Sequence, residues 1–106
     1  LYIPTDNTMA SSAETIKNVV IPAGIPVIAG EAGLCAAGVA TLSISYYSIG
    51  RKTGEMAYEI LVNNKKPGDM EIEFADTFTK MYNEENCKAL NLTVPEDYEK
   101  LEVAAE

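Results

Sequence analysis

Short apolar runs separated by polar turns organise the first third of the chain. Residues 1–3 (LYI) form an apolar run typical of a buried strand, and residues 8–20 carry apolar side chains at helical spacing. Pro22 and Gly24 end that helix. Residues 25–29 (IPVIA) are apolar on both sides, as in a parallel strand that helices cover on both faces. The pattern predicts a strand–helix–strand unit.

A similar alternation continues to the end of the chain. Residues 39–45 alternate apolar and small polar side chains, which predicts a strand, and residues 46–63 show a helical stripe of apolar positions. Gly50 and Gly54 lie on that helix, and each lowers helix stability by roughly 1 kcal/mol, so we expect a close packing neighbour there. The remaining predictions are a strand or extended segment at 71–74, a strand at 78–82, a short helix at 83–90 with Asn91 as its left-handed C-cap, and a solvated helix at 96–106. The fold class is therefore α/β, with a parallel sheet and flanking helices.

Composition narrows the possible functions. The 106 residues are 47% apolar, which suffices for the core of one modest domain and excludes a disordered chain. The net charge is -8 with eight Lys and Arg, so we expect no nucleic-acid partner. Cys35 and Cys87 lack CxxC spacing and histidine is absent, which disfavours structural zinc. We interpret the two cysteines as buried or unpaired thiols, with a long-range disulfide as the alternative.

Two loops carry the candidate chemistry. In open α/β sheets, ligands bind beyond the carboxyl ends of the strands, where helix N-termini offer free amides. Residues 4–8 (PTDNT) and 30–33 (GEAG) follow the first two predicted strands, and each loop holds a carboxylate, Asp6 or Glu31. Because consecutive parallel strands usually lie close together, both carboxylates are candidates to converge on one ligand, for which a cationic amine is the natural choice.

Other roles are open for these residues. Asp6, like Asn7 or Thr8, is suited to cap the following helix, and Glu31 is compatible with a solvated loop acid. A carboxylate pair also serves as general acid and base in hydrolases. However, the sequence holds no G-x-S-x-G elbow, no histidine and no glycine-lysine phosphate loop.

Tyr46 and Tyr47 are candidate stacking surfaces for a flat ligand. Adjacent helical residues point about 100° apart, so at most one of them faces a given pocket. The favoured alternative is that one of the two is packed and the other exposed.

Five motifs occur in an order that resembles a known family. They are IPTDNTMASSA at 3–13, IPVIAGEAG at 25–33, SYYSIGRKTGEMAYEIL at 45–61, NNKKPGDMEIEF at 63–74 and NCKALNLTVP at 86–95. Together they resemble the ABC-type substrate-binding proteins of the tryptophan/tyrosine-associated family. The resemblance covers the chain up to the acidic end.

The resemblance implies a periplasmic-binding type I fold, in which two Rossmann-like lobes close on a ligand. We expect this sequence to be the C-terminal part of such a protein and to begin inside the fold. Residues 1–95 would supply second-lobe strands and a crossover helix at about 46–63, and residues 96–106 an acidic tail. The apolar face of the crossover helix would need a covering partner, so homo-oligomerisation of this part alone is expected.

The resemblance also implies a function. The protein would be the non-enzymatic receptor of an ABC importer, without cofactor or metal, delivering an aromatic or apolar amino acid to an ABC permease. It would be extracytoplasmic, as a periplasmic protein or a cell-surface lipoprotein, with its signal segment outside this sequence. Six residues would lie at the ligand: Thr5, Asp6, Asn7, Thr8, Glu31 and Tyr46. The alternative is a ligand-sensing regulatory domain of the same fold.

In this scheme each polar residue has a role. Asp6 would pair with the ligand ammonium group, and Asn7 would hydrogen-bond to the ligand. Sugar-binding relatives carry Asn-Asp where this chain has Asp6-Asn7, so which of the two contacts the ligand stays open. Glu31 would hold a second polar group or orient its loop.

Overall fold

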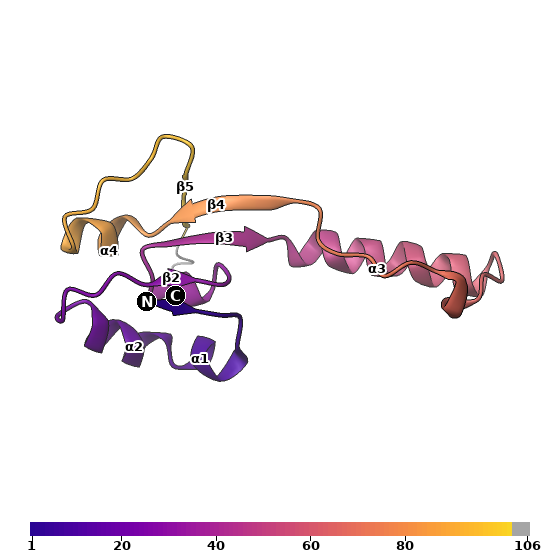
Figure 1. Cartoon of the computed structure of the whole chain (residues 1–106), viewed down its shortest axis with the longest axis horizontal. Coiled ribbons are helices and arrows are strands. Elements are labelled where there is room, and N and C mark those ends of the chain that lie inside the picture. Colours follow the sequence, from indigo (N-terminus) through magenta and orange to yellow (C-terminus); the bar gives the residue numbers. More distant parts are fainter. Residues whose placement is uncertain (103–106) are drawn as a thin grey trace. The chain divides into compact units, whose positions relative to one another are not determined.

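The computed structural model describes residues 1–102 and divides into two compact units. The first unit comprises Leu1–Ser43 and the chain from Thr79 onward, and the second comprises Ile44–Phe78. The described residues form a sheet with the strand order β1-β2-β3-β4-β5 (Figure 1). Its strands are β1 (Tyr2–Ile3), β2 (Ile28–Ala29), β3 (Ala40–Ile44), β4 (Phe78–Tyr82) and β5 (Glu99–Lys100). The predicted α/β class is confirmed.

The sheet is mixed rather than wholly parallel. β1, β2 and β3 are parallel, with Tyr2 opposite Ile28 and Ile28 opposite Ala40. β4 runs in the opposite direction to β3, as Figure 1 shows, and the Asn83 amide at its end donates to the Val39 carbonyl at the start of β3 (3.0 Å). The reversal follows from connectivity, because the chain leaves the sheet at the end of β3 and returns through the second unit. β5 is parallel to β4.

The helix predicted over residues 8–20 is two helices, α1 (Asn7–Ser11) and α2 (Ala13–Val20). They break at Ser12, whose amide donates to the Met9 carbonyl three residues back (3.1 Å). The Ser11 hydroxyl donates to the Thr8 carbonyl (2.8 Å). Short hydroxyl side chains compete with helical hydrogen bonds in this way, and the apolar spacing, which continues through the break, does not reveal it.

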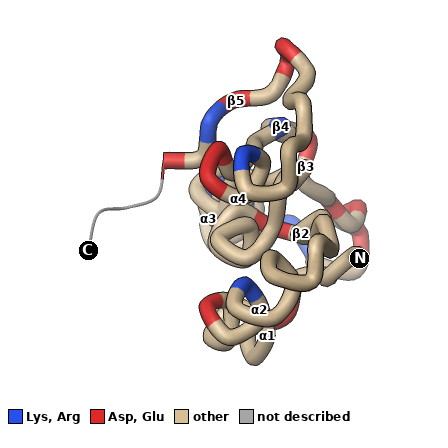
Figure 2. The backbone as a smooth tube through the Cα atoms, turned by 90° about the vertical axis from the view of Figure 1, so that its left-hand side faces the viewer, with Lys and Arg blue, Asp and Glu red and all other residues tan. Residues whose placement is uncertain are grey.

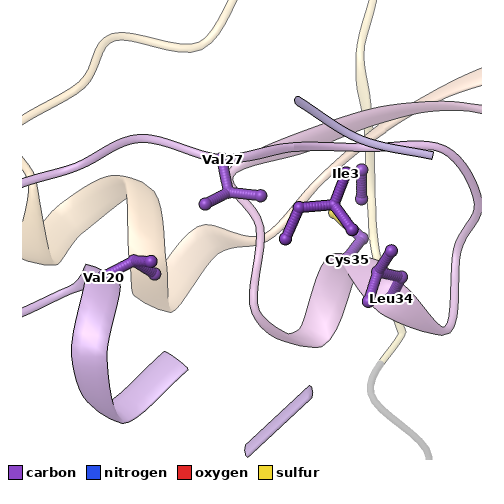
Figure 3. Close-up of a cluster of buried hydrophobic side chains, with 6 residues drawn as sticks. Ile3, Val20, Val27, Leu34 and Cys35 are labelled. Carbon is purple, nitrogen blue, oxygen red and sulfur yellow. The ribbon is translucent and has the colours of Figure 1, made fainter. Parts of the chain in front are cut away.

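One face of the sheet in the first unit carries the core. Figure 3 shows the buried cluster. Ile16 and Leu101, which are partly buried, pack against it. Its members are Ile3, Val20, Val27, Ala29, Leu34 and Cys35. They come from β1, from β2 and the residue before it, from the end of α2 and from the 3₁₀ helix η1 (Leu34–Ala36). The core therefore lies directly beneath the loop that follows β2.

The opposite face of these strands is open in the described part of the chain. Tyr2, Ile28 and Leu42 alternate with buried neighbours and are 65%, 45% and 54% exposed. The prediction that helices cover both faces is thus met on one face only within residues 1–102.

The second unit consists of α3 (Tyr46–Leu61) and a return segment that contains the 3₁₀ helix η2 (Pro67–Asp69). Ser45 caps α3, since its hydroxyl oxygen accepts from the Ser48 amide (3.2 Å). Lys52 pairs with Glu73 of the return segment (3.1 Å). The segment predicted as strand or extended chain at 71–74 is not a strand, and Ile72 and Phe74 are largely exposed.

Gly50 and Gly54 have no close neighbour in the described structure. A Cβ added at either position would meet nothing within 4 Å. α3 as a whole contains no buried residue. The packing neighbour expected for these glycines is therefore not among residues 1–102.

The solvated helix predicted for residues 96–106 is wrong for the part that is described, because Glu99–Lys100 forms β5; residues 103–106 lie outside the described residues. The Leu101 amide donates to the Tyr82 carbonyl (2.8 Å). Lys100 also pairs with Glu84 at the start of α4 (Glu84–Ala89). Figure 2 shows that both basic and acidic residues occur in β5 and α4. Hydrogen bonds from Lys100 and Lys88 lower the pKa of Glu84. Strand pairing to β4, a non-local interaction, overrides the local preference for helix.

Candidate ligand-binding site

The loops that follow β1 and β2 lie in contact, and Gly30 is the point of contact. Its amide donates to the Ile3 carbonyl (2.8 Å), and the Thr5 hydroxyl donates to the Gly30 carbonyl (3.3 Å). A Cβ at position 30 would lie 2.6 Å from the Thr5 nitrogen and 2.9 Å from the Pro4 carbonyl carbon. Only glycine permits this approach of two backbones. The structure thus brings together the two loops that the sequence singled out.

Asp6 caps α1. Its backbone is extended (φ −152°, ψ 127°), and its Oδ1 accepts a hydrogen bond from the Met9 amide (2.8 Å). Of the three candidate caps, this residue therefore has the role, while Asn7 and Thr8 lie exposed in the first turn. A carboxylate has about four acceptor sites, so capping leaves the exposed Asp6 with capacity for a second partner.

Glu31 turns its carboxylate back onto its own loop. Oε2 accepts from the Gly33 amide (2.8 Å) and Oε1 from the Leu34 amide (2.5 Å). Glu31 thereby satisfies amides at the start of η1 and is itself half-buried. It is not a freely solvated loop acid. Because both its oxygens are engaged, it is also poorly arranged to exchange protons with a substrate as the partner of Asp6.

Two asparagines at the β4–α4 corner hold the other end of the same loop. The Asn83 side-chain amide donates to the Cys35 carbonyl (3.1 Å), and the Asn86 amide donates to the carbonyls of Ala36 (3.0 Å) and Gly38 (2.8 Å). Both side chains are buried. Sequence reasoning assigned residues 83–90 to a helix and missed this role, because the carbonyls that the two side chains contact are distant in sequence.

Cys35 and Cys87 are free and buried, which confirms their interpretation as unpaired thiols. Burial, followed by the neighbouring Cys87 and Glu31, raises the pKa of Cys35 to about 12. Burial also raises the pKa of Cys87, whose Sγ lies 3.4 Å from the Val39 carbonyl oxygen. Thiols held in the protonated form are poor nucleophiles and poor metal ligands.

Tyr46 belongs to the second unit, where it is the first residue of α3 and is more than half exposed. Within residues 1–102, no group of three or more His, Cys, Asp or Glu side chains is placed to hold a metal ion. Nor does that part of the chain contain a helix long and apolar enough to span a membrane.

Residues 1–105 match the family model described as ABC transporter substrate binding protein. The chain belongs to this family. A tyrosine-binding protein of Clostridioides difficile (strain R20291) is 38% identical over 93 residues, a match that covers 87% of this chain and 27% of that protein. The resemblance inferred from the five sequence motifs is thereby confirmed.

Solved structures give the same fold for this substrate-binding family member. The ligand-free, open structure of a substrate-binding protein with adhesive properties from Clostridium difficile is 38% identical, with a TM-score of 0.72, over 94% of this chain and 35% of that one. A conserved domain protein from Vibrio cholerae is 27% identical, with a TM-score of 0.80, over 93% and 35% of the two chains. A structure from Streptococcus pneumonia in complex with L-Trp has a TM-score of 0.78 at 24% identity, over 93% and 36%, and supports the fold alone.

The chain thus spans only about a quarter to a third of the relatives it matches. In a family of substrate-binding proteins, paired loops at the carboxyl ends of parallel strands are natural ligand contacts. The contact between the loops at Gly30 lies entirely within this chain.

Proposed function

We propose that the loops Pro4–Thr8 and Gly30–Gly33 form one wall of the pocket in which the complete substrate-binding protein captures an amino acid with an aromatic or apolar side chain. The observation that carries this proposal is the backbone contact at Gly30 in a chain that is 38% identical to a tyrosine-binding protein. The contact fixes two strand-end loops against each other, as a preformed pocket requires.

The site residues divide into ligand contacts and loop supports. Asp6 pairs with the ligand ammonium group through the oxygen that is not engaged by Met9. Asn7, Thr5 and Thr8 offer further hydrogen bonds beside it. Glu31 orients the second loop, a role that its two bonds to the Gly33 and Leu34 amides support.

The remainder of the pocket would come from protein outside this chain. Its relatives are roughly three times longer, so a second wall that holds the ligand carboxylate is expected there. The complete protein would act outside the cytoplasm, in the periplasm or as a cell-surface lipoprotein, and deliver its solute unchanged to an ABC permease. The family description, a transporter substrate-binding protein, supports that assignment.

Thermal unfolding of the complete protein against a panel of solutes tests this function. A ligand that binds the native state at 100 times its Kd adds about 2.7 kcal/mol to the free energy of unfolding, which is readily seen as a rise in Tm. We expect L-tyrosine, L-tryptophan or L-phenylalanine to raise Tm, and D-tyrosine and glucose to leave it unchanged. The amino acid should be recovered chemically intact. Stabilisation by sugars or purines and by no amino acid would contradict the proposed ligand class.

A further inference from the structure

The buried side chains of Asn83 and Asn86 connect the β4–α4 corner to the candidate pocket loop. Asn83 is the N-cap of α4, and its Oδ1 accepts from the Asn86 amide (3.1 Å). The same side chain donates through Nδ2 to the Cys35 carbonyl (3.1 Å). Asn83 thus links the start of α4 to η1, and its partner Cys35 is 48 residues away in sequence.

Asn86 makes a complementary contact. Its Nδ2 donates both hydrogens, one to the Ala36 carbonyl (3.0 Å) and one to the Gly38 carbonyl (2.8 Å). The last carbonyls of a helix lack intrahelical partners, so a buried donor is needed at this point. Only an amide or cationic nitrogen can donate to two carbonyls at once, and Asn86 is 1% exposed, which disfavours a charge.

The loop Gly30–Gly38 is therefore fixed at three points. Gly30 holds its first residue against the loop after β1, Glu31 satisfies the amides at the start of η1, and the asparagine pair satisfies the carbonyls at its end. These contacts favour one conformation, because their loss would leave the buried donors and the Ala36 and Gly38 carbonyls unpaired. The Asn86 Oδ1 atom has no hydrogen-bond partner within the described residues, so the donors carry the argument.

We propose that Asn83 and Asn86 are positioning residues for the ligand site: they set the conformation of Gly30–Gly38 and thereby the affinity for the amino acid, without touching it. The inference rests on the proposed function, since it takes Gly30–Gly33 as a pocket wall. It assigns to the β4–α4 corner a role in binding that neither the sequence motifs nor the family description specifies.

Variants of the complete protein test this role. Asn86→Leu keeps the approximate shape of the side chain and removes both donors. Asn83→Ser keeps an oxygen suited to capping α4 and removes the amide donor to Cys35. Val20→Ala is the matched control, because Val20 is a buried residue that lies at the opposite end of the core cluster from Leu34 and Cys35 (Figure 3). The three variants are compared by Tm, by the Kd for L-tyrosine from calorimetry, and by hydrogen exchange of the amides from 33 to 38.

Both asparagine variants should weaken L-tyrosine binding by about tenfold or more, with a comparable acceleration of exchange at residues 33–38. Val20→Ala should lower Tm but leave Kd within about twofold of the wild type. The proposal would be overturned if Val20→Ala, at a Tm equal to that of the asparagine variants, lost as much affinity as they do. Wild-type affinity in both asparagine variants would also overturn it. If Asn86→Leu does not fold, Asn83→Ser decides by the same criteria.

Ligand binding tests the ligand class, and amide exchange tests the positioning role independently of it. If the wild type binds none of L-tyrosine, L-tryptophan and L-phenylalanine, the proposed ligand class is wrong, and the exchange rates alone then decide the positioning role. Unchanged exchange at residues 33–38 in both asparagine variants would refute that role whatever the ligand.

Discussion

Substitution of Gly30 by alanine should separate the two pocket loops. The new methyl group would lie 2.6 Å from the Thr5 nitrogen and 2.9 Å from the Pro4 carbonyl carbon, and both are backbone atoms that cannot rotate away. The loops must therefore open by about 0.8 Å, the difference between 2.6 Å and the 3.4 Å of ordinary contact. Such an opening stretches the bond from the Gly30 amide to the Ile3 carbonyl and the bond from Thr5 to the Gly30 carbonyl.

The cost can be set from known cases of overpacking. Forcing a methyl group into a well-packed site costs about 1–3 kcal/mol, and a weakened backbone hydrogen bond adds up to about 1 kcal/mol. We therefore expect Gly30→Ala to lower the free energy of unfolding of the complete protein by about 2 kcal/mol. Since the displaced loop carries the proposed pocket wall, the Kd for L-tyrosine should rise by about tenfold or more, the equivalent of 1.4 kcal/mol.

Urea unfolding and calorimetry on the same preparations measure both effects. Gly68→Ala is the matched control, because a Cβ there meets nothing within 4 Å and η2 lies in the second unit. It should change stability by less than about 0.5 kcal/mol. If Gly30→Ala is as stable as the control and binds ligand as tightly, the close contact between the loops does not exist as described.

Three further outcomes follow from the structure. Asp6→Asn should preserve the α1 cap and Tm, yet weaken the binding of an amine ligand, measured by calorimetry, by about tenfold. Asp6→Ala should weaken binding as well and also lower the free energy of unfolding by about 1 kcal/mol. If both variants bind the ligand as tightly as the wild type, Asp6 does not belong to the site. The pKa of Cys35 is raised to about 12 and that of Cys87 is also raised, so both thiols ionise more readily in the unfolded chain. The free energy of unfolding should therefore fall as pH rises above about 9. A thiol reagent at about pH 8 should label the two cysteines only on unfolding. Rapid labelling of the native protein would contradict their burial. The 106-residue chain by itself should self-associate through the exposed sheet face and α3, and sedimentation that shows a compact monomer at high concentration would refute this.

Local signals in the sequence predicted much of the fold. The strand at 78–82 matches β4 residue for residue, and Asn91 has the left-handed backbone expected of a C-cap (φ 53°). The candidate caps of α1 included Asp6, which the structure selects. Each of these features depends on a few neighbouring residues, so periodicity and capping chemistry suffice to reveal them.

The errors arose where distant contacts decide the conformation. Glu99–Lys100 has the composition of a solvated helix but pairs with β4, and Lys100 reaches Glu84 across sixteen positions. For Glu31 the sequence left open a ligand contact, a solvated acid and an orienting role for its loop, and its bonds to the Gly33 and Leu34 amides support the last of these. The role of Asn83 and Asn86 depends on carbonyls about 50 residues away, which no local pattern contains.

A crystal structure of the complete protein with bound L-tyrosine tests the central claim most directly. We expect the ligand ammonium group within hydrogen-bonding distance, roughly 2.7–2.9 Å, of an Asp6 carboxylate oxygen. The ligand should also lie against the loop that begins at Gly30. A ligand bound elsewhere, with the loops Pro4–Thr8 and Gly30–Gly33 untouched, would contradict the assignment of these loops as the pocket wall.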